Sequence, residues 1–223
     1  MSVDPVYLDP AATSPLRPAA RDAIVRCWES GSANTMSAHA GGRAARAILA
    51  EARERVAGLG GVAPDQLYFT SGATESSNLA IRGLARATPG RRGRIVTTRI
   101  EHAATVRACE VLAHSGWTVT TLPPDSEGLV DPDELERALE AGKANLVSII
   151  GGHNELGTVQ RLAELADIAH RHGALFHVDA VQAAGTADLA AVAWDMLSLS
   201  GHKLGGPQGI GALAIRPEPP IRP

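Results

Sequence analysis

The chain is poor in lysine, cysteine and aromatic residues. Its 223 residues include 19 arginines but only two lysines, two cysteines and 3% aromatic residues. The spacing of Cys27 and Cys109 matches no metal motif, and His170 and His172 would not face one another on a helix, so no metal site is expected. Both cysteines fall in stretches of helical period, and we expect them to be buried, unreactive thiols.

Long hydrophobic runs and an excess of charge of one sign are also absent. No stretch reaches the roughly 18 unbroken apolar residues of a membrane helix, and residues 1–10 do not resemble a secretory signal. We therefore expect a cytoplasmic protein. The net charge of −3 is spread along the chain, which argues against nucleic acid and anionic membranes as partners. The only basic run, 86–94, contains proline and glycine and is predicted to be a solvated loop.

What the chain does have is an apolar content of 44%, enough for one substantial core. Stretches of helical period alternate with short apolar runs, which is typical of a mostly parallel sheet with crossover helices. Helices are expected at 19–28, 43–59, 75–86, 103–115, 132–141 and 162–172. Strands are expected at 66–70, 94–98, 118–122, 146–150, 174–178, 196–200 and 211–215.

The predicted fold class is therefore α/β, a three-layer αβα sandwich around a mostly parallel sheet of seven strands. The last strand follows its predecessor too closely for a helical crossover, so we expect it to be antiparallel. We divide the chain into an N-terminal arm with an active-site segment (1–42), one large domain (43–216) and a proline-rich end (217–223), where the chain looks interrupted.

Polar residues that follow the strand runs are the candidates for function, because open parallel sheets bind ligands beyond the carboxyl ends of their strands. The turn 70–75 contains Gly72 and opens a helix, where free backbone N–H groups suit a phosphate; a plain helix cap is the simpler alternative. The run 176–182 delivers Asp179 at a strand end. A buried carboxylate there needs a partner such as a protonated ring nitrogen, or it caps the next helix.

Lys203 is the residue with the clearest chemical role. It follows the expected strand 196–200 and is bordered by Gly201 and Gly205, which let another group approach the backbone. Desolvation there favours a neutral amine that can bond to a carbonyl compound. The alternative is a lysine whose stem packs and whose head reaches water. The other lysine, Lys143, lies in a polar turn.

Two further polar segments follow strand runs in the same way. They are Glu101-His102 and the loop 153–157, which contains Asn154. Either segment alone is as consistent with an ordinary polar loop. A nicotinamide-binding domain is disfavoured, because no strand is followed by a G-x-G-x-x-G turn.

Taken together in this order, the segments resemble the aminotransferase class V family of fold-type I pyridoxal-phosphate (PLP) enzymes. Within that family they are most similar to the cysteine desulfurases that supply sulfur for iron–sulfur clusters. The resemblance covers nearly the whole chain. The matching strings are Tyr7-Leu8-Asp9 with Ala11-Ala12-Thr13, Ser71-Gly72-Ala73-Thr74-Glu75-Ser76, Glu101-His102, Asn154-Glu155 with Gly157, His177-Val178-Asp179-Ala180 with Gln182, and Ser200-Gly201-His202-Lys203 with Gly206-Pro207.

By this resemblance the cofactor is PLP, carried by Lys203 and paired through its pyridine nitrogen with Asp179. His102 would stack on the ring and act with Lys203 in catalysis. The remaining implied contacts are Ala73, Thr74, Ser200 and His202 to the phosphate, Gln182 and Asn154 to the ring oxygen, and Ala12 and Asn154 to the amino-acid substrate, expected to be L-cysteine.

The chain also departs from the family pattern. The family's asparagine-proline-serine-serine segment is 34–39 here, and the usual first asparagine of the later loop is His153. The family continues into a second domain that holds a sulfur-accepting cysteine and an arginine for the substrate carboxylate, and neither Cys27 nor Cys109 matches that cysteine.

We therefore expect a chain that binds PLP and activates cysteine but is weak or inactive by itself. We expect it to act as a homodimer or with a chain that supplies the second domain. The alternatives are a lyase, aminotransferase or racemase of the same family, and a non-catalytic partner protein.

Overall fold

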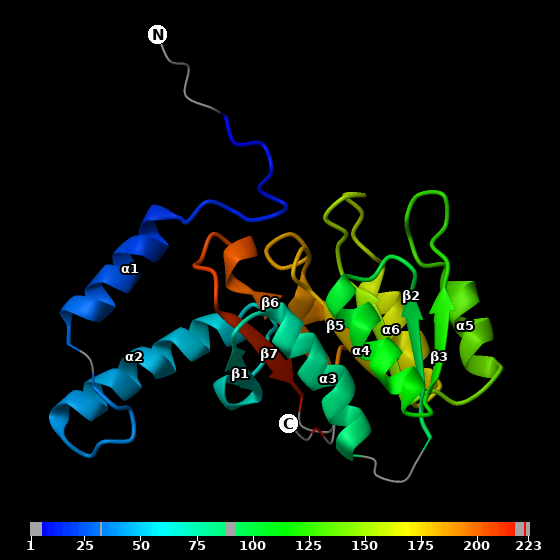
Figure 1. Cartoon of the computed structure of the whole chain (residues 1–223), viewed down its shortest axis with the longest axis horizontal. Coiled ribbons are helices and arrows are strands. Elements are labelled where there is room, and N and C mark those ends of the chain that lie inside the picture. Colours follow the sequence, from blue (N-terminus) through cyan, green and yellow to red (C-terminus); the bar gives the residue numbers. More distant parts are fainter. Residues whose placement is uncertain (1–5, 32, 88–91, 217–220, 222–223) are drawn as a thin grey trace.

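The computed structural model describes residues 6–31, 33–87, 92–216 and 221, which form six α-helices and seven strands (Figure 1). The helices are α1 (Pro18–Glu29), α2 (Ala40–Ala57), α3 (Ala73–Ala87), α4 (Ala103–His114), α5 (Pro132–Glu140) and α6 (Leu162–Arg171). The strands are β1 (Leu67–Thr70), β2 (Arg94–Thr98), β3 (Thr118–Leu122), β4 (Leu146–Ile150), β5 (Leu175–Asp179), β6 (Met196–Ser200) and β7 (Gly211–Ile215). Short 3₁₀ turns lie at Pro64–Gln66, Leu189–Ala191 and Gly201–Lys203.

The strands form one sheet in the order β1-β7-β6-β5-β4-β2-β3. β7 is antiparallel to both of its neighbours, β1 and β6. The other neighbouring pairs are parallel. The turn between β6 and β7 is too short to cross over the sheet, so the chain can only return beside the strand it has left. This confirms the predicted mostly parallel sheet with an antiparallel last strand.

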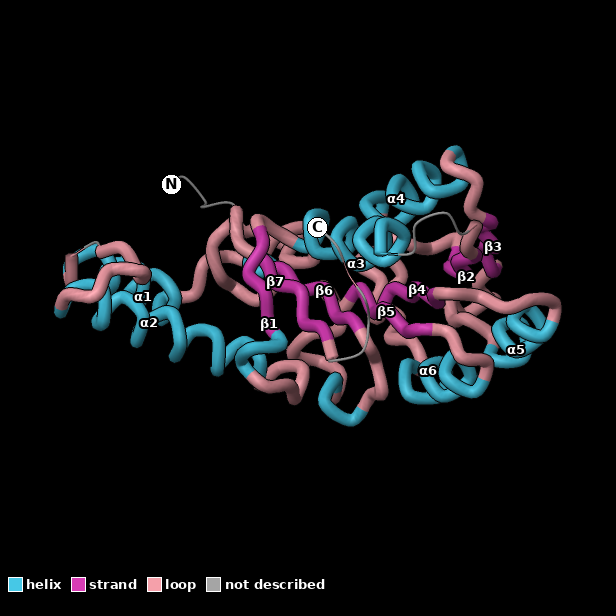
Figure 2. The backbone as a smooth tube through the Cα atoms, turned by 90° about the horizontal axis from the view of Figure 1, so that it is seen from below, coloured by secondary structure: helices cyan, strands magenta, loops and turns pink. Residues whose placement is uncertain are grey.

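Helices cover both faces of the sheet. α3 and α4 lie on one face, and α5 and α6 lie on the other (Figure 2). Ile81 of α3 and Leu112 of α4 belong to one buried cluster. Leu135 of α5 and Leu165 of α6 belong to another. Every residue of β4 and β6 is buried, and apart from Ser148, Ser198 and Ser200 these central strands consist of apolar residues, as is typical of strands covered on both faces. The three-layer αβα architecture is therefore confirmed.

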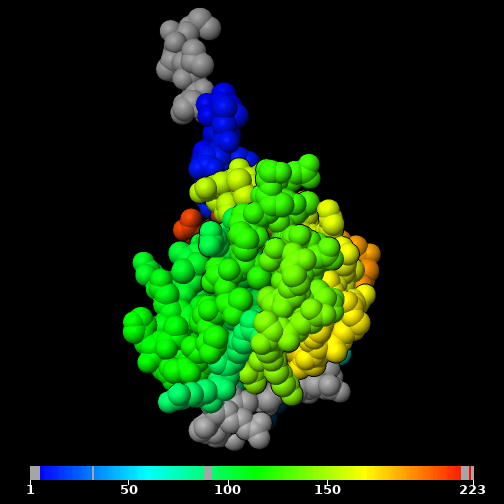
Figure 3. Space-filling model, turned by 90° about the vertical axis from the view of Figure 1, so that its right-hand side faces the viewer, coloured from blue at the N-terminus to red at the C-terminus, as the bar shows by residue number. Residues whose placement is uncertain are grey.

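The N-terminal arm lies at the end of the molecule where the parallel strands finish. In Figure 1 the arrows of β2 and β3 point towards this end, and the first described residues pass across it. Figure 3 shows the same arm, in blue, standing beside green and yellow-green loops. From there the chain runs into α1, none of whose residues is buried. The arm therefore covers the edge at which a ligand of such a sheet would bind.

Several element boundaries differ from the sequence expectation. α2 begins at Ala40 rather than at residue 43, because the Nδ1 atom of His39 accepts the Gly42 N–H at 3.4 Å and caps the helix. β5 extends to Asp179, which pairs with Ile150 of β4. The carboxylate therefore belongs to the strand itself. The other helix and strand ends lie within two residues of the expected ones, and five of the seven strands have the expected bounds.

Parts of two expectations lie outside the described residues. The predicted loop 86–94 includes residues 88–91, and the proline-rich end 217–223 is described only at Ile221. Among the helices of the described residues, none is both long and apolar enough to span a membrane.

The expectation that both cysteines are buried is wrong for one of them. Cys27 is exposed, whereas Cys109 is buried, with 3% of its surface accessible. The helical period around Cys27 shows where an apolar face would be, but α1 packs no residue into the core. Burial, with a smaller contribution from nearby Glu101, raises the pKa of the Cys109 thiol to about 12.

Iodoacetamide should therefore distinguish the two thiols in the folded protein. At neutral pH we expect rapid alkylation of Cys27 and almost none of Cys109, whose shift from a pKa of 9.0 to about 12 leaves on the order of a thousandfold less reactive thiolate. Peptide mass spectrometry measures both sites, and unfolding in urea should make their rates similar. Equal rates in the folded protein would contradict the buried position of Cys109.

Candidate active site

One open cavity of about 420 Å³ lies at the carboxyl ends of the parallel strands. It brings together every residue that the sequence nominated for cofactor or substrate binding. These are Ala12, Ala73, Thr74, His102, Asn154, Asp179, Gln182, Ser200, His202 and Lys203. They come from six separate segments of the chain and meet because parallel strands present their carboxyl ends at one edge.

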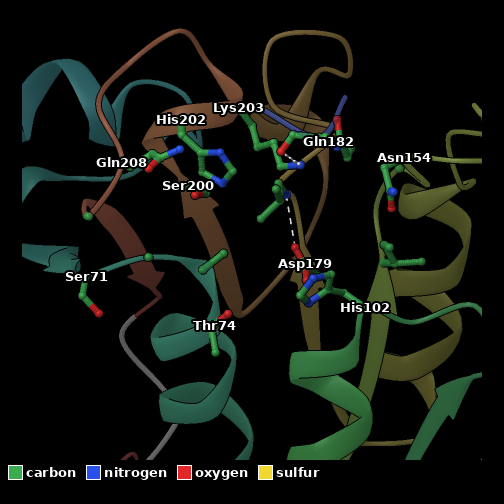
Figure 4. Close-up of a pocket in the computed structure, with 17 residues that line it drawn as sticks. Ser71, Thr74, His102, Asn154, Asp179, Gln182, Ser200, His202, Lys203 and Gln208 are labelled. Atoms are coloured by element: carbon green, nitrogen blue, oxygen red, sulfur yellow. Dashed lines mark hydrogen bonds between the residues drawn. The ribbon is translucent and has the colours of Figure 1, made fainter. Parts of the chain in front are cut away.

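Lys203 enters the cavity from the short helical turn that follows β6 (Figure 4). Its Nζ donates hydrogen bonds to the carbonyls of Ala11 and Ala12, the latter at 2.8 Å. Partial burial lowers the pKa of this amine, while Asp9 and Asp179 act in the opposite direction. A lowered pKa increases the share of neutral, nucleophilic amine near neutral pH.

The N-terminal arm is docked directly on the Lys203 segment. The Ser14 N–H donates to the His202 carbonyl at 2.9 Å, and the Ser14 hydroxyl donates to the Lys203 carbonyl at 3.0 Å. The Arg17 N–H donates to the carbonyl of Gly205 at 2.9 Å. A Cβ atom at Gly205 would lie 2.5 Å from the Arg17 side chain, and its φ of 78° also favours glycine. The sequence predicted that another group approaches the backbone at Gly205, and in the structure that group is the N-terminal arm at Arg17.

Asp179 lies on the floor of the cavity at the end of β5. Only 3% of its surface is accessible, and burial raises the pKa of its carboxyl despite the opposing influence of His102 and Lys203. Its Oδ1 accepts the Val181 N–H at 3.2 Å (Figure 4). No cation forms an ion pair with it among the described residues. The Asp179 side chain caps the following turn, in line with the alternative that it is a helix cap, but it also lines the cavity.

His102 lies beside Asp179 at the start of α4 (Figure 4). Its Nδ1 accepts the Ala104 N–H at 3.1 Å and so caps the helix. A nitrogen that accepts a hydrogen bond carries no hydrogen, so the neutral ring holds its hydrogen on Nε2. The capping bond therefore fixes both the tautomer and the orientation of this exposed imidazole.

The opposite side of the cavity is built from the start of α3. Ala73 and Thr74 lie in its first turn, where backbone N–H groups have no carbonyl one turn earlier to accept them. Ser200 and His202 line the cavity above Thr74 (Figure 4). Glu75 accepts hydrogen bonds from the N–H and hydroxyl of Ser71, at 2.7 and 2.6 Å, and holds the turn in shape. This side is suited to an anionic group.

Gln182 and His202 connect the cavity to the arm. The Gln182 amide donates to the Ala11 carbonyl at 2.8 Å. The His202 Nδ1 and the Thr13 hydroxyl share a hydrogen bond of 3.0 Å. Burial, and then the charge of Lys203, lower the pKa of His202, so this ring is mainly neutral at physiological pH.

Of the two departures from the family pattern, His153 lies in a loop that reaches the cavity, whereas the segment 34–39 does not line it. His153 accepts the N–H groups of Glu155 and Leu156 with its Nδ1, both at 3.1 Å, and so closes the loop that presents Asn154 to the cavity. An imidazole here does what an asparagine side chain does in such turns. The segment 34–39 contributes no lining residue within the described part of the chain.

The sequence analysis assigned no role to several residues that line the cavity. They are Ser71, Gly72, Ile150, Gly152, Val181, Gln208 and Gly209. Ser71 and Gly72 lie within a turn that the sequence had already singled out. Gln208 follows Pro207 in the turn that leads into β7, and the rule about polar residues near strand ends would have found it if applied to that turn as well.

Comparison with known proteins agrees with this geometry. The family described as aminotransferase class-V matches residues 6–220. A cysteine desulfurase IscS of Dictyoglomus turgidum is 42% identical over 98% of this chain and 56% of its own length. A cysteine desulfurase of Mus musculus is 41% identical over 98% of this chain and 48% of its own length. The chain thus spans about half the length of the curated relatives it matches.

A solved structure of a NifS-like protein is similar in three dimensions as well. It superposes with a TM-score of 0.92 at 36% identity, covering 98% of this chain and 60% of that one. The family match extends over the arm, the whole sheet and every segment that lines the cavity. The chain therefore belongs to the aminotransferase class V family and is similar to its cysteine desulfurases.

Proposed function

We propose that this chain binds PLP in the cavity and activates an amino acid, L-cysteine, for sulfur transfer. The observation that carries the proposal is the convergence of Lys203, Asp179 and His102 in one cavity, with an anion-binding helix start on its opposite side. We assign residues 43–216 to the PLP-binding domain and residues 1–42 to an arm that completes the site.

The chemistry of these residues fits PLP. A buried carboxylate with a raised pKa and no cationic partner among the described residues suits a group that brings a protonated ring nitrogen. PLP, when bound, supplies an electron sink that stabilises negative charge at the carbon next to the substrate amine. Asp179 would hold the ring nitrogen protonated and so maintain that property.

Lys203 has two tasks in this proposal. Its amine, with its lowered pKa, would hold the cofactor, and as a free amine it would move protons at the substrate carbon. His102 would cover the ring with its imidazole, whose orientation is fixed by the hydrogen bond from the Ala104 N–H. Lys203 lies in the short helical turn after β6 and His102 caps the start of α4, so regular elements position both side chains before substrate binds.

The remaining residues divide between the phosphate and the substrate. Ala73, Thr74, Ser200 and His202 would hold the phosphate at the start of α3. Gln182 and Asn154 would contact the ring oxygen. Ala12 and Asn154 would face the substrate, because the arm and the loop closed by His153 enter the cavity from the side of Lys203 and His102.

The partners and cellular role follow from the same proposal. Association as a homodimer, or with a segment equivalent to the rest of the relatives' length, is expected, and the sulfur would serve iron–sulfur cluster assembly. A cytoplasmic location stays a prediction from the sequence. A lyase or aminotransferase activity remains the alternative, since these activities use the same cofactor-binding residues.

Sulfide release by the 223-residue chain tests the proposal. Neither cysteine lines the cavity: Cys27 is exposed on α1 and Cys109 is a buried residue of α4. The PLP-loaded chain should therefore release little sulfide from cysteine. Correct orientation of the reacting groups can lower an activation barrier by roughly 7–11 kcal/mol. Without a placed sulfur acceptor, much of that reduction is lost. Methylene blue detection of sulfide, with dithiothreitol present to reduce any persulfide to sulfide, provides the measurement.

The controls are Cys27→Ser, Cys109→Ser and addition of the polypeptide that corresponds to the uncovered half of the relatives. Increased release only when that polypeptide is added would support the proposal. Robust release by the chain alone that disappears in Cys27→Ser or Cys109→Ser would overturn it, because one of these thiols would then be the sulfur acceptor.

A further inference from the structure

β2 and β4 are neighbours in the sheet, but their backbone pairing stops before the cavity. Their paired residues end at Val96 and Val147. On the other side of β4, pairing with β5 continues to Ile150 and Asp179. The two strands β2 and β4 therefore separate just where Ile150 and His102 line the cavity.

Side chains bridge the gap between these strand ends. The Thr97 hydroxyl donates to the Ser148 carbonyl at 2.9 Å. One carboxyl oxygen of Glu101, Oε1, accepts the Ile150 N–H at 2.8 Å and the Thr98 hydroxyl at 2.9 Å. Without Glu101 the buried Ile150 N–H would lose its acceptor, which is costly inside a protein.

The surroundings of Glu101 disfavour a charge on it. Its second oxygen, Oε2, is buried without a hydrogen-bond partner, and no cation pairs with the carboxyl in the part of the chain that the structure describes. The titratable groups that face it are Asp179 and Cys109. Asp179 repels a second negative charge, and the Cys109 thiol stays neutral. Burial raises the pKa of Glu101 to about 8, although the hydrogen bonds from the Ile150 N–H and the Thr98 hydroxyl act in the opposite direction.

We propose that Glu101 is a positioning residue, buried as a neutral carboxylic acid, that ties the end of β2 to the end of β4 and thereby fixes His102 at the cavity. Glu101 does not itself line the cavity, and its neutrality avoids a second negative charge beside Asp179, which matters for holding a protonated ring. The identity of that ring rests on the proposed function. The hydrogen bonds by which Glu101 links the ends of β2 and β4, here called the tie, and the charge state of Glu101 do not.

Amide hydrogen exchange of the cofactor-free protein tests the tie. Glu101→Leu removes both acceptor bonds, so exchange at Ile150 and at Ala104, whose N–H caps onto His102, should accelerate by at least about tenfold. Glu101→Gln keeps an acceptor oxygen and should stay near wild type. Amides of α6 serve as the internal reference. Unchanged exchange at Ile150 in a folded Glu101→Leu protein, or equal acceleration in Glu101→Gln, would overturn the tie.

Urea unfolding between pH 5 and pH 8 tests the neutral state. A carboxyl with a pKa of 4.5 when unfolded and about 8 when folded stabilises fully below pH 4.5, and this stabilisation is lost as pH rises towards 8. The wild-type midpoint should therefore fall relative to Glu101→Gln across this range. Glu110→Gln, an equivalent change on the exposed side of α4, should parallel wild type. Parallel curves for wild type and Glu101→Gln would show that Glu101 is ionised.

PLP binding separates this inference from the proposed function. If wild type binds PLP, Glu101→Leu should weaken binding at neutral pH by about tenfold or more, and Glu101→Gln should not. If wild type fails to bind PLP, the proposed function falls, while exchange and urea unfolding still decide the role of Glu101. Normal PLP affinity in a folded Glu101→Leu protein would remove its positioning role.

Discussion

Treatment of the PLP-loaded protein with borohydride should fix the cofactor on Lys203, and replacing Lys203 with alanine should abolish both the trapping and the visible absorbance band. Lys203 is the lysine that lines the cavity, and its pKa is lowered by burial. A neutral amine attacks a carbonyl, whereas an ammonium cannot. The effect is expected to be complete, because no other lysine lines the cavity among the residues that the structure describes.

Lys143→Ala is the matched control. Lys143 is the only other lysine of the chain and is exposed in the turn after α5, so its removal should leave the band and the trapped peptide unchanged. Peptide mapping after reduction locates the cofactor. Trapping on Lys143, or absence of the band at saturating PLP in wild type, would contradict the proposed role of Lys203.

Asp179→Asn should damage function far more than folding. The amide keeps the shape of the carboxyl but cannot hold a protonated ring nitrogen by charge. Breaking a buried charge pair costs about 3–5 kcal/mol, which corresponds to a loss of about 10²–10⁴-fold in the rate of proton transfer at the substrate carbon. Exchange of the substrate α-hydrogen with deuterated solvent, measured by NMR, reports this step without requiring a sulfur acceptor.

The stability of the cofactor-free variant distinguishes a catalytic role from a structural one. The pKa of Asp179 is raised on folding, so an ionised Asp179 destabilises the folded protein as pH rises above the unfolded value. Asp179→Asn should therefore be at least as stable as wild type at pH 8. Wild-type exchange together with reduced stability would identify Asp179 as a structural cap only.

Asp195→Asn provides the comparison. Asp195 accepts the Phe176 N–H at 2.6 Å and hydrogen-bonds His170 at 2.8 Å, at the start of β6 and away from the cavity. Loss of the carboxylate there should lower the urea midpoint without changing PLP affinity. Asp179→Asn should therefore reduce proton transfer without reducing stability, whereas Asp195→Asn should reduce stability without changing PLP affinity.

The candidate site could be predicted largely from local sequence. Lys203, Asp179 and His102 all follow or end apolar runs, and the carboxyl ends of parallel strands meet at one edge of a sheet. Once the alternation of strands and helices indicated a parallel sheet, polar residues at strand ends were expected to converge. The antiparallel β7 could be predicted for a similar reason, since a short connection permits no crossover.

Long-range contacts could not be predicted in this way. The arm carbonyls of Ala11 and Ala12 accept hydrogen bonds from Lys203, which lies about 190 residues later in the chain. Such contacts depend on how the arm packs over the turn after β6, and no local periodicity encodes that. The exposure of Cys27 has the same origin, because helical period marks an apolar face of α1 but not whether another element covers it.

The sequence by itself determined the residue types of the site, the order of strands along the chain and the edge at which functional side chains gather. Only the tertiary structure decided which strands are neighbours, where β2 and β4 separate, and that Glu101 is buried in the gap between them. The physical reason is that a strand's apolar run requires burial on both faces, whereas strand order and the state of a buried acid depend on packing between segments distant in sequence.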